Sequence, residues 1–169
     1  MAVREVLLYP DPALKRGARP VHPTDAGLAR RVANDLLDTM HAHTGCVGLA
    51  APQLGELVRM VVVDVSDHPR APPNHNGLLL LVNPRITSSS GGEVAREGCL
   101  SIPHLTANVR RATVVTVEAE TPSGERLALQ SEAFEARCLQ HEIDHLDGVL
   151  FLDRVDSIRT DVFPRKRYR

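Results

Sequence analysis

The sequence has few of the residues on which several protein classes depend. Tryptophan is absent and aromatic residues make up only 3% of the 169 residues, which argues against a surface that stacks nucleic-acid bases. Neither charge sign is in excess, because 20 Lys and Arg face 21 Asp and Glu, so electrostatic capture of nucleic acid is not the main task of the chain. Three cysteines are too few, and of the wrong parity, for a disulfide scaffold.

Long hydrophobic runs are missing as well. The longest, residues 60–63 and 78–82, fall far short of the ~20 apolar residues of a membrane span. The first ten residues lack the basic segment and apolar run of a signal peptide. We therefore expect a reduced, cytoplasmic protein with no membrane partner. The length suits one compact unit, and we assign residues 1–169 to a single domain.

Hydrophobic periodicity and turn residues predict an α+β fold. Apolar residues recur every four positions from 28 to 40, which predicts an amphipathic helix over 25–43, and similar spacing predicts a second helix over 132–146. Aliphatic and β-branched runs predict strands at 60–65, 78–82, 113–120 and 126–130, with turns at 88–92 and 121–124. Because strands dominate between one N-terminal and one C-terminal helix, we predict antiparallel or mixed sheets packed around the C-terminal helix.

The strongest chemical signal is His141-Glu142-Ile143-Asp144-His145, in the second predicted helix. Residues four apart lie on one helix face, so two imidazoles can bind one metal ion while the glutamate reaches a water molecule beside it. A chance pair of surface histidines is the alternative, but the apolar neighbourhood favours a metal site. No His or Glu follows His145, which argues against the downstream ligand that ordinary zinc metallopeptidases use.

The third ligand must then lie upstream. Cys99, within Glu97-Gly98-Cys99-Leu100-Ser101, is favoured because a thiolate with two imidazoles suits Zn²⁺ or Fe²⁺. Cys138 competes from the same helix, although three ligands from a turn and a half would enclose an ion poorly. If both cysteines joined the two histidines, the result would be a closed, structural zinc site rather than an enzyme. A buried structural thiol is the alternative for either cysteine.

A third segment, residues 45–53, combines small residues, which let a substrate backbone approach closely, with the amide of Gln53. Taken in order, residues 46–53, 97–101 and 140–145 resemble the three motifs of the peptide deformylases. The resemblance extends from about residue 3 to residue 152. It includes the stretches Tyr9-Pro10-Asp11-Pro12 and His145-Leu146-Asp147-Gly148.

The resemblance implies an enzyme that removes the N-formyl group from N-formylmethionyl peptides of nascent proteins and releases formate. It implies one divalent metal ion, Fe²⁺ being expected and Zn²⁺, Ni²⁺ or Co²⁺ able to replace it. The implied ligands are Cys99, His141 and His145, the implied general base and acid is Glu142, and the implied oxyanion donors are Gln53 and the backbone N–H of Leu100. Glu97 and Arg111 would form a buried pair behind the site, and the methionine pocket would be lined by Cys46, Val47, Gly48, Phe134 and Cys138.

Two positions depart from the family pattern. Cys46 stands where the first motif has glycine, and Thr106 stands where many bacterial members have an arginine that helps to hold substrate. Both changes affect the substrate cleft, so a specialised second-copy deformylase with altered substrate or inhibitor tolerance is an alternative. The basic tail, residues 165–169, is predicted to be a frayed, solvated end, with contact to ribosomal RNA as its alternative.

Overall fold

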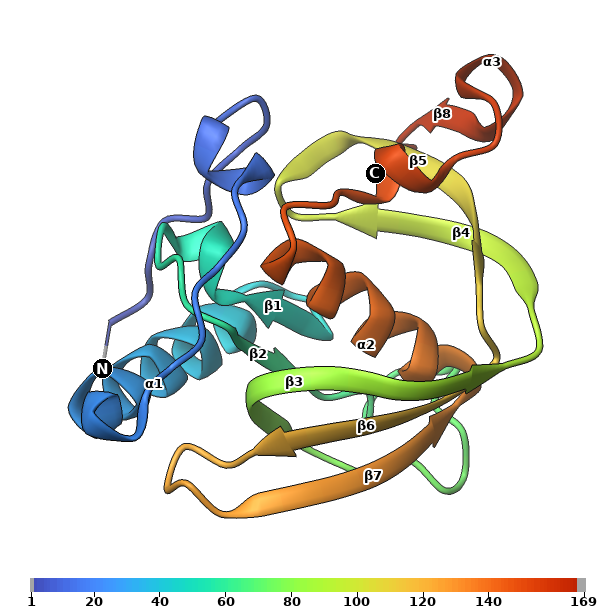
Figure 1. Cartoon of the computed structure of the whole chain (residues 1–169). Coiled ribbons are helices and arrows are strands. Elements are labelled where there is room, and N and C mark those ends of the chain that lie inside the picture. The colour runs from blue at the N-terminus through green and yellow to red at the C-terminus, as the bar shows by residue number, and fades with distance from the viewer. Residues whose placement is uncertain (1, 167–169) are drawn as a thin grey trace.

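Two antiparallel sheets and two long helices organise the computed structural model, which describes residues 2–166 (Figure 1). The larger sheet has the strand order β1-β2-β3-β6-β7 and the smaller one the order β4-β5-β8. Helix α2 lies between the two sheets, whereas α1 covers β1 and β2 from the other side (Figure 1). The predicted α+β class, with sheets packed around the C-terminal helix, is confirmed.

The long helices lie close to their predicted positions. The helices are α1 (Ala26–Ala42), α2 (Ala133–Leu146) and the short α3 (Ile158–Asp161). The strands are β1 (Gly48–Ala50), β2 (Met60–Val63), β3 (Leu79–Ser90), β4 (Glu93–Cys99), β5 (Ile102–Arg111), β6 (Val114–Glu120), β7 (Arg126–Glu132) and β8 (Val162–Pro164). Within residues 2–166, none of the helices combines the length and the apolar character that crossing a bilayer requires.

Strand β2 is buried on both faces, and this places the two long helices. Successive side chains of a strand point to opposite sides. Met60 and Val62 pack with the apolar stripe of α1, whereas Val61 and Val63 pack with α2. At ~25 cal/mol per Å² of apolar surface, burial of four aliphatic side chains from one short strand contributes several kcal/mol. The continuous run of aliphatic residues at 60–63 is therefore the sequence signature of a doubly covered strand.

The middle of the chain differs from the prediction. We expected a strand to end at Asn83-Pro84 and a turn over 88–92, but β3 continues through both positions to Ser90. A register shift between Val82 and Arg85 accommodates the proline as a bulge, where Asn83 adopts a φ of 50°. The turn is confined to Gly91 and Gly92, and it leads into β4 and β5, which the sequence patterns did not predict.

The C-terminal segment returns to the smaller sheet. Strand β8 pairs with β5, and the backbone N–H of Arg165 donates to the carbonyl of His104 at 2.8 Å. Arg165 is therefore held against the sheet rather than frayed. Lys166 is exposed, and the last three residues of the predicted basic tail, 167–169, lie outside the described residues.

Candidate active site

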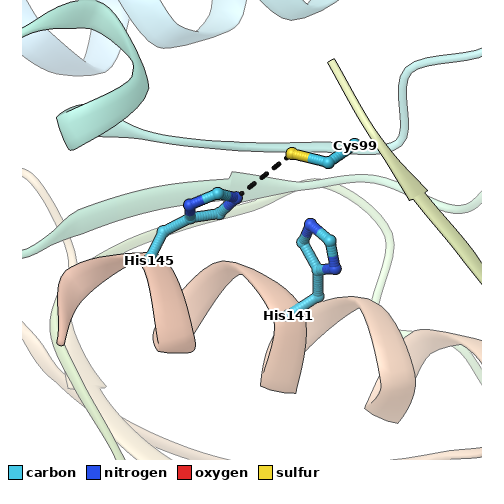
Figure 2. A group of neighbouring side chains, drawn as sticks. All are labelled: Cys99, His141 and His145. Atoms are coloured by element: carbon cyan, nitrogen blue, oxygen red, sulfur yellow. Dashed lines mark hydrogen bonds between the residues drawn. The ribbon is translucent and has the colours of Figure 1, made fainter. Parts of the chain in front are cut away.

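Three side chains from two elements converge between the sheets. Cys99 is the last residue of β4, whereas His141 and His145 project from the same face of α2 (Figure 2). One ligand atom from each lies within 4.8 Å of the others, and Sγ of Cys99 is 3.4 Å from Nε2 of His145. All three residues are buried. One thiol and two imidazoles from separate elements make a donor set that suits a tetrahedral divalent metal with a remaining open position.

Buried charges behind His141 fix its orientation, whereas Nδ1 of His145 is buried without a hydrogen-bond partner among the described residues. Glu97 lies 2.9 Å from Nδ1 of His141, which therefore donates its proton there and keeps Nε2 free as a ligand atom. Arg111 donates to both oxygens of Glu97, at 2.8 and 3.0 Å, and Arg137 donates at 2.9 Å. Burial opposes ionisation of Glu97, but His141 and Arg111 outweigh it and hold the pKa of this carboxyl well below its usual range.

The surroundings of the Cys99 thiol favour its ionised form, as the surroundings of Glu97 favour its carboxylate. Its burial favours the neutral thiol, but the electrostatic attraction of His145 and the contacts with both histidines lower its pKa well below the usual value. The thiolate is the form of cysteine that binds metals. Because Cys99 is the cysteine that joins the histidine pair among the described residues, the arrangement favours it over Cys138 as third ligand.

Glu142 lies against the first motif. A Cβ atom placed on Gly48 would be 2.7 Å from Oε1 of Glu142, so only glycine lets β1 and this carboxylate approach so closely. Oε2 of Glu142 is buried and has no hydrogen-bond partner among the described residues. Burial raises the pKa of Glu142 to about 7, near the value at which a carboxylate both accepts and returns a proton.

The Gln53 amide has a fixed orientation. Its Oε1 accepts from the backbone N–H of Ala50 at 2.9 Å, so its Nε2 is directed toward Ser101 at 3.1 Å and Cys99 at 3.4 Å. Gln53 is buried and lines the same cleft as Leu100. The structure thus places both predicted oxyanion donors, the Gln53 amide and the backbone N–H of Leu100, beside Cys99.

A cleft opens beside these groups and contains about 890 Å³ of free space, part of it open to solvent. All five residues that the sequence assigned to a methionine pocket line it: Cys46, Val47, Gly48, Phe134 and Cys138.

The thiols of Cys46 and Cys138 differ from that of Cys99. Burial raises the pKa of Cys46 to about 12 and raises that of Cys138 further, so both remain neutral and are poor metal ligands. The Cys46 thiol donates to the carbonyl of Gly48 at 3.1 Å.

Several cleft residues were missed in the sequence. His68 stacks on Phe134 with ring centroids 4.2 Å apart, and the guanidinium of Arg70 lies 4.4 Å from the centroid of the same ring. Both residues line the cleft, together with Arg96, Arg137 and Arg165. Arg137 could have been found, because it precedes His141 by four positions on one helix face. The other residues come from a loop, from β4 and from the segment after β8, and their spacing in the sequence gives no sign that they meet.

Comparison with known proteins agrees with this geometry. Residues 3–161 match the family model described as polypeptide deformylase. A peptide deformylase from Thermodesulfovibrio yellowstonii is 39% identical over 166 residues, which cover 98% of this chain and 97% of that protein. Peptide deformylase 2 from Vibrio cholerae is 41% identical, with 98% and 94% covered.

Solved structures give the same result. A class I type b peptide deformylase from Acinetobacter baumannii superposes with a TM-score of 0.84 at 35% identity, covering 92% of this chain and 100% of that one. The peptide deformylase from Thermus thermophilus has a TM-score of 0.80 at 42% identity, with 90% and 86% covered. The chain, a hydrolase with the fold of these proteins, belongs to the polypeptide deformylase family.

Proposed function

We propose that this chain hydrolyses the N-formyl group of N-formylmethionyl peptides of nascent proteins, with release of formate. The observation that carries the proposal is the meeting of Cys99, His141 and His145 beside a buried, partly unpartnered Glu142 at the base of the cleft. Family membership supports the same activity, and an inhibitor-bound relative, the actinonin complex of the Acinetobacter baumannii enzyme, supports a ligand site in this fold.

The residues present fit a divalent metal, with Fe²⁺ expected and Zn²⁺, Ni²⁺ or Co²⁺ able to replace it. The donor set is supported by the lowered pKa of the Cys99 thiol and by the contact of Glu97 with Nδ1 of His141, which leaves Nε2 as the ligand atom. A bound divalent ion supplies a Lewis acid that polarises a carbonyl and lowers the pKa of water.

The chain's own side chains would perform the proton transfers and hold the substrate. Glu142 accepts the proton of the attacking water and returns it to the departing amine, which becomes the free N-terminus. Nε2 of Gln53 and the backbone N–H of Leu100 donate to the oxyanion that forms at the formyl carbon, and one such donor can be worth about 3 kcal/mol. Glu97 and Arg111 hold His141 in the tautomer that this arrangement needs.

The architecture also supports an extended peptide as substrate. Strand β1 is the edge of the larger sheet and β4 the edge of the smaller one, and residues of both line the cleft. Edge strands offer unpaired backbone groups to an added strand. The methionine side chain would then occupy the space lined by Val47, Phe134 and Cys138.

Other functions have less support. Cys138 lies outside the metal-binding cluster and keeps a neutral thiol, which disfavours a closed structural zinc site. A relative named simply peptide deformylase and one named peptide deformylase 2 are similarly close, at 39% and 41% identity, so a specialised second copy is not favoured.

Formate release tests the proposal. The metal-loaded protein is incubated with formyl-Met-Ala-Ser, acetyl-Met-Ala-Ser and an unblocked peptide of the same sequence. We expect formate from the first and no cleavage of the other two. Cleavage of internal peptide bonds would indicate a metallopeptidase, and absence of any reaction in metal-loaded protein would indicate a structural metal site.

Contact with ribosomal RNA through the basic tail stays a prediction. Arg165 and Lys166 are exposed. A chain that ends at Pro164 should lose co-sedimentation with ribosomes if the tail makes this contact, and unchanged co-sedimentation would exclude it.

A further inference from the structure

Three exposed arginines line the cleft without an acidic partner. Arg70, Arg96 and Arg165 all border it, and none forms an ion pair with a carboxylate among residues 2–166. The fourth arginine of the cleft, Arg137, is buried and already bonded to Glu97. We call Arg70, Arg96 and Arg165 the arginine rim.

The acidic groups of the cleft do not neutralise this rim. Four arginines and two glutamates line the cleft. Glu97 is already paired with Arg111 and Arg137, and Glu142 is buried beneath Gly48. The mouth of the cleft therefore carries an excess of positive charge, although the whole chain has a net charge of −1.

Neutral contacts hold the side chains of two rim arginines, Arg70 and Arg96, in place. Arg70 lies over the ring of Phe134. Arg96 lies 3.7 Å from the centroid of Phe163 and donates to Asn108 at 3.0 Å and to Thr106 at 3.2 Å. Such stacking and neutral hydrogen bonds orient a guanidinium without cancelling its charge.

Arg165 lies over the edge strand at which a substrate peptide would add. A Cβ atom on Gly98 of β4 would be 3.4 Å from Nη2 of Arg165. Strand β8 pairs with β5 on the side opposite β4 (Figure 1). Arg165 follows β8 directly, and its backbone N–H donates to the carbonyl of His104 in β5. Residues of an extended peptide are about 3.3 Å apart, so the first residues after the methionine, if they add to β4, would lie near Arg165.

We propose that the arginine rim selects formyl peptides that carry a carboxylate within two residues after the formylmethionine. The carboxylate belongs either to an Asp or Glu side chain or to the C-terminus of a very short peptide. This inference rests on the proposed function and adds a substrate preference to it. Planar guanidinium groups bind carboxylates through paired hydrogen bonds, which gives the preference its chemical basis.

The expected preference is modest and depends on salt. Exposed ion pairs are weak, so kcat/KM should favour the acidic peptide by about two- to fivefold over its amide isostere. Because the rim is exposed, the preference should shrink toward unity at about 0.5 M NaCl, where the Debye length is only a few ångströms.

The test compares kcat/KM of the metal-loaded enzyme for matched peptides. Formyl-Met-Ala-Glu and formyl-Met-Ala-Gln, both amidated at the C-terminus, measure the side-chain carboxylate. Formyl-Met-Ala-Gln with a free C-terminus measures the terminal carboxylate. Preference for either carboxylate over the amidated Gln peptide supports the proposal and identifies its source, whereas equal kcat/KM for all three peptides overturns it.

Substitution then assigns the preference to the rim. The double variant Arg70→Gln/Arg165→Gln should lose it, so that the ratio of kcat/KM for the acidic and the amidated Gln peptides falls to about one. Arg30→Gln, an exposed position on α1 remote from the cleft, is the matched control and should keep the preference. A preference that survives in the double variant overturns the proposal.

A binding measurement separates this proposal from the proposed function. Calorimetry on the metal-loaded protein with the product peptides Met-Ala-Glu and Met-Ala-Gln, both amidated, needs no turnover. Tighter binding of the Glu peptide, lost in the double variant, supports the rim even if no formate is released from any substrate. Formate release with equal binding of both products would overturn the rim alone.

Discussion

Two parts of the site differ in how their charges are paired: the exposed arginine rim and the inner wall, by which we mean the buried residues Glu97, Cys99, Arg111, His141, Glu142 and His145. On the inner wall, Glu97 and Arg111 are each 4% exposed at the side chain, and each charge has several hydrogen-bonded partners. On the rim, the guanidinium groups are exposed and lack acidic partners among the described residues. A buried ion pair with several hydrogen bonds holds one geometry, whereas an unpaired surface charge is available to a ligand. The inner wall is therefore suited to catalysis, and the rim is suited to selection among peptide substrates.

Removal of the thiol ligand should have the largest effect. Cys99→Ala should lose bound metal and lower formate release by more than about two orders of magnitude, since even loss of an outer partner of a metal site costs 10–100-fold. Metal content per chain and formate release measure this. Cys138→Ala is the matched control, because its neutral thiol lies outside the metal-binding cluster, and it should keep its metal. Loss of metal in both variants would favour the closed zinc site.

Breaking the buried ion network should destabilise the fold. Arg111→Met leaves Glu97 and Asp144 without their shared partner, and we expect a loss of about 3 kcal/mol in the free energy of unfolding. Denaturant titration measures it. Arg154→Met removes a half-exposed partner of the same Asp144 and should cost about 1 kcal/mol or less. Equal losses in both variants would contradict the difference between buried and exposed charge.

Crowding Glu142 should slow the reaction without unfolding the protein. In Gly48→Ala the added Cβ would lie 2.7 Å from Oε1 of Glu142, so the carboxylate must move. A shift of about 1 Å in a reacting group can cost about 100-fold in rate, and we expect kcat to fall by that order. Gly27→Ala on α1 meets no atom within 4 Å and serves as the control. An unchanged kcat in Gly48→Ala would contradict the placement of Glu142.

The smallest effect is expected at Cys46, the departure from the family pattern at the mouth of the cleft. Because burial raises its thiol pKa to about 12, Cys46 stays protonated at neutral pH and does not compete for the metal. Cys46→Gly should keep one metal per chain and change kcat/KM by less than about threefold. Steady-state kinetics and metal analysis check this, and a second equivalent of metal in the wild type that disappears in the variant would refute it.

The sequence predicted the inner wall better than the rim, for physical reasons. His141, Glu142 and His145 share one helix face, and helical spacing is readable in a single sequence. The doubly buried β2 was equally readable from its aliphatic run. By contrast, β4 and β5 form a hairpin rich in exposed and polar residues, so neither strand has the aliphatic run that reveals a buried strand. The arginine rim joins a loop, β4 and the segment after β8, and no local pattern reports such a meeting.

Thr106 illustrates the same limit. The sequence indicated only that the family's substrate-holding arginine is replaced there. In the structure Thr106 accepts a hydrogen bond from Arg96, and Gly98 beside it faces Arg165, so two guanidinium groups from other segments reach this part of the cleft. Comparison with the family motif detects that an arginine is missing at position 106. It does not detect arginines that other segments bring to the same part of the cleft.

Formate release by wild type and Glu142→Gln at equal metal content tests the central claim most directly. The amide has the shape of the carboxylate but cannot accept the proton, and metal binding should stay intact because Glu142 is not part of the metal-binding cluster. We predict that wild type releases formate from formyl-Met-Ala-Ser and that Glu142→Gln, with the same metal per chain, is slower by at least about 100-fold. A fully metal-loaded Glu142→Gln that releases formate at the wild-type rate would contradict the account.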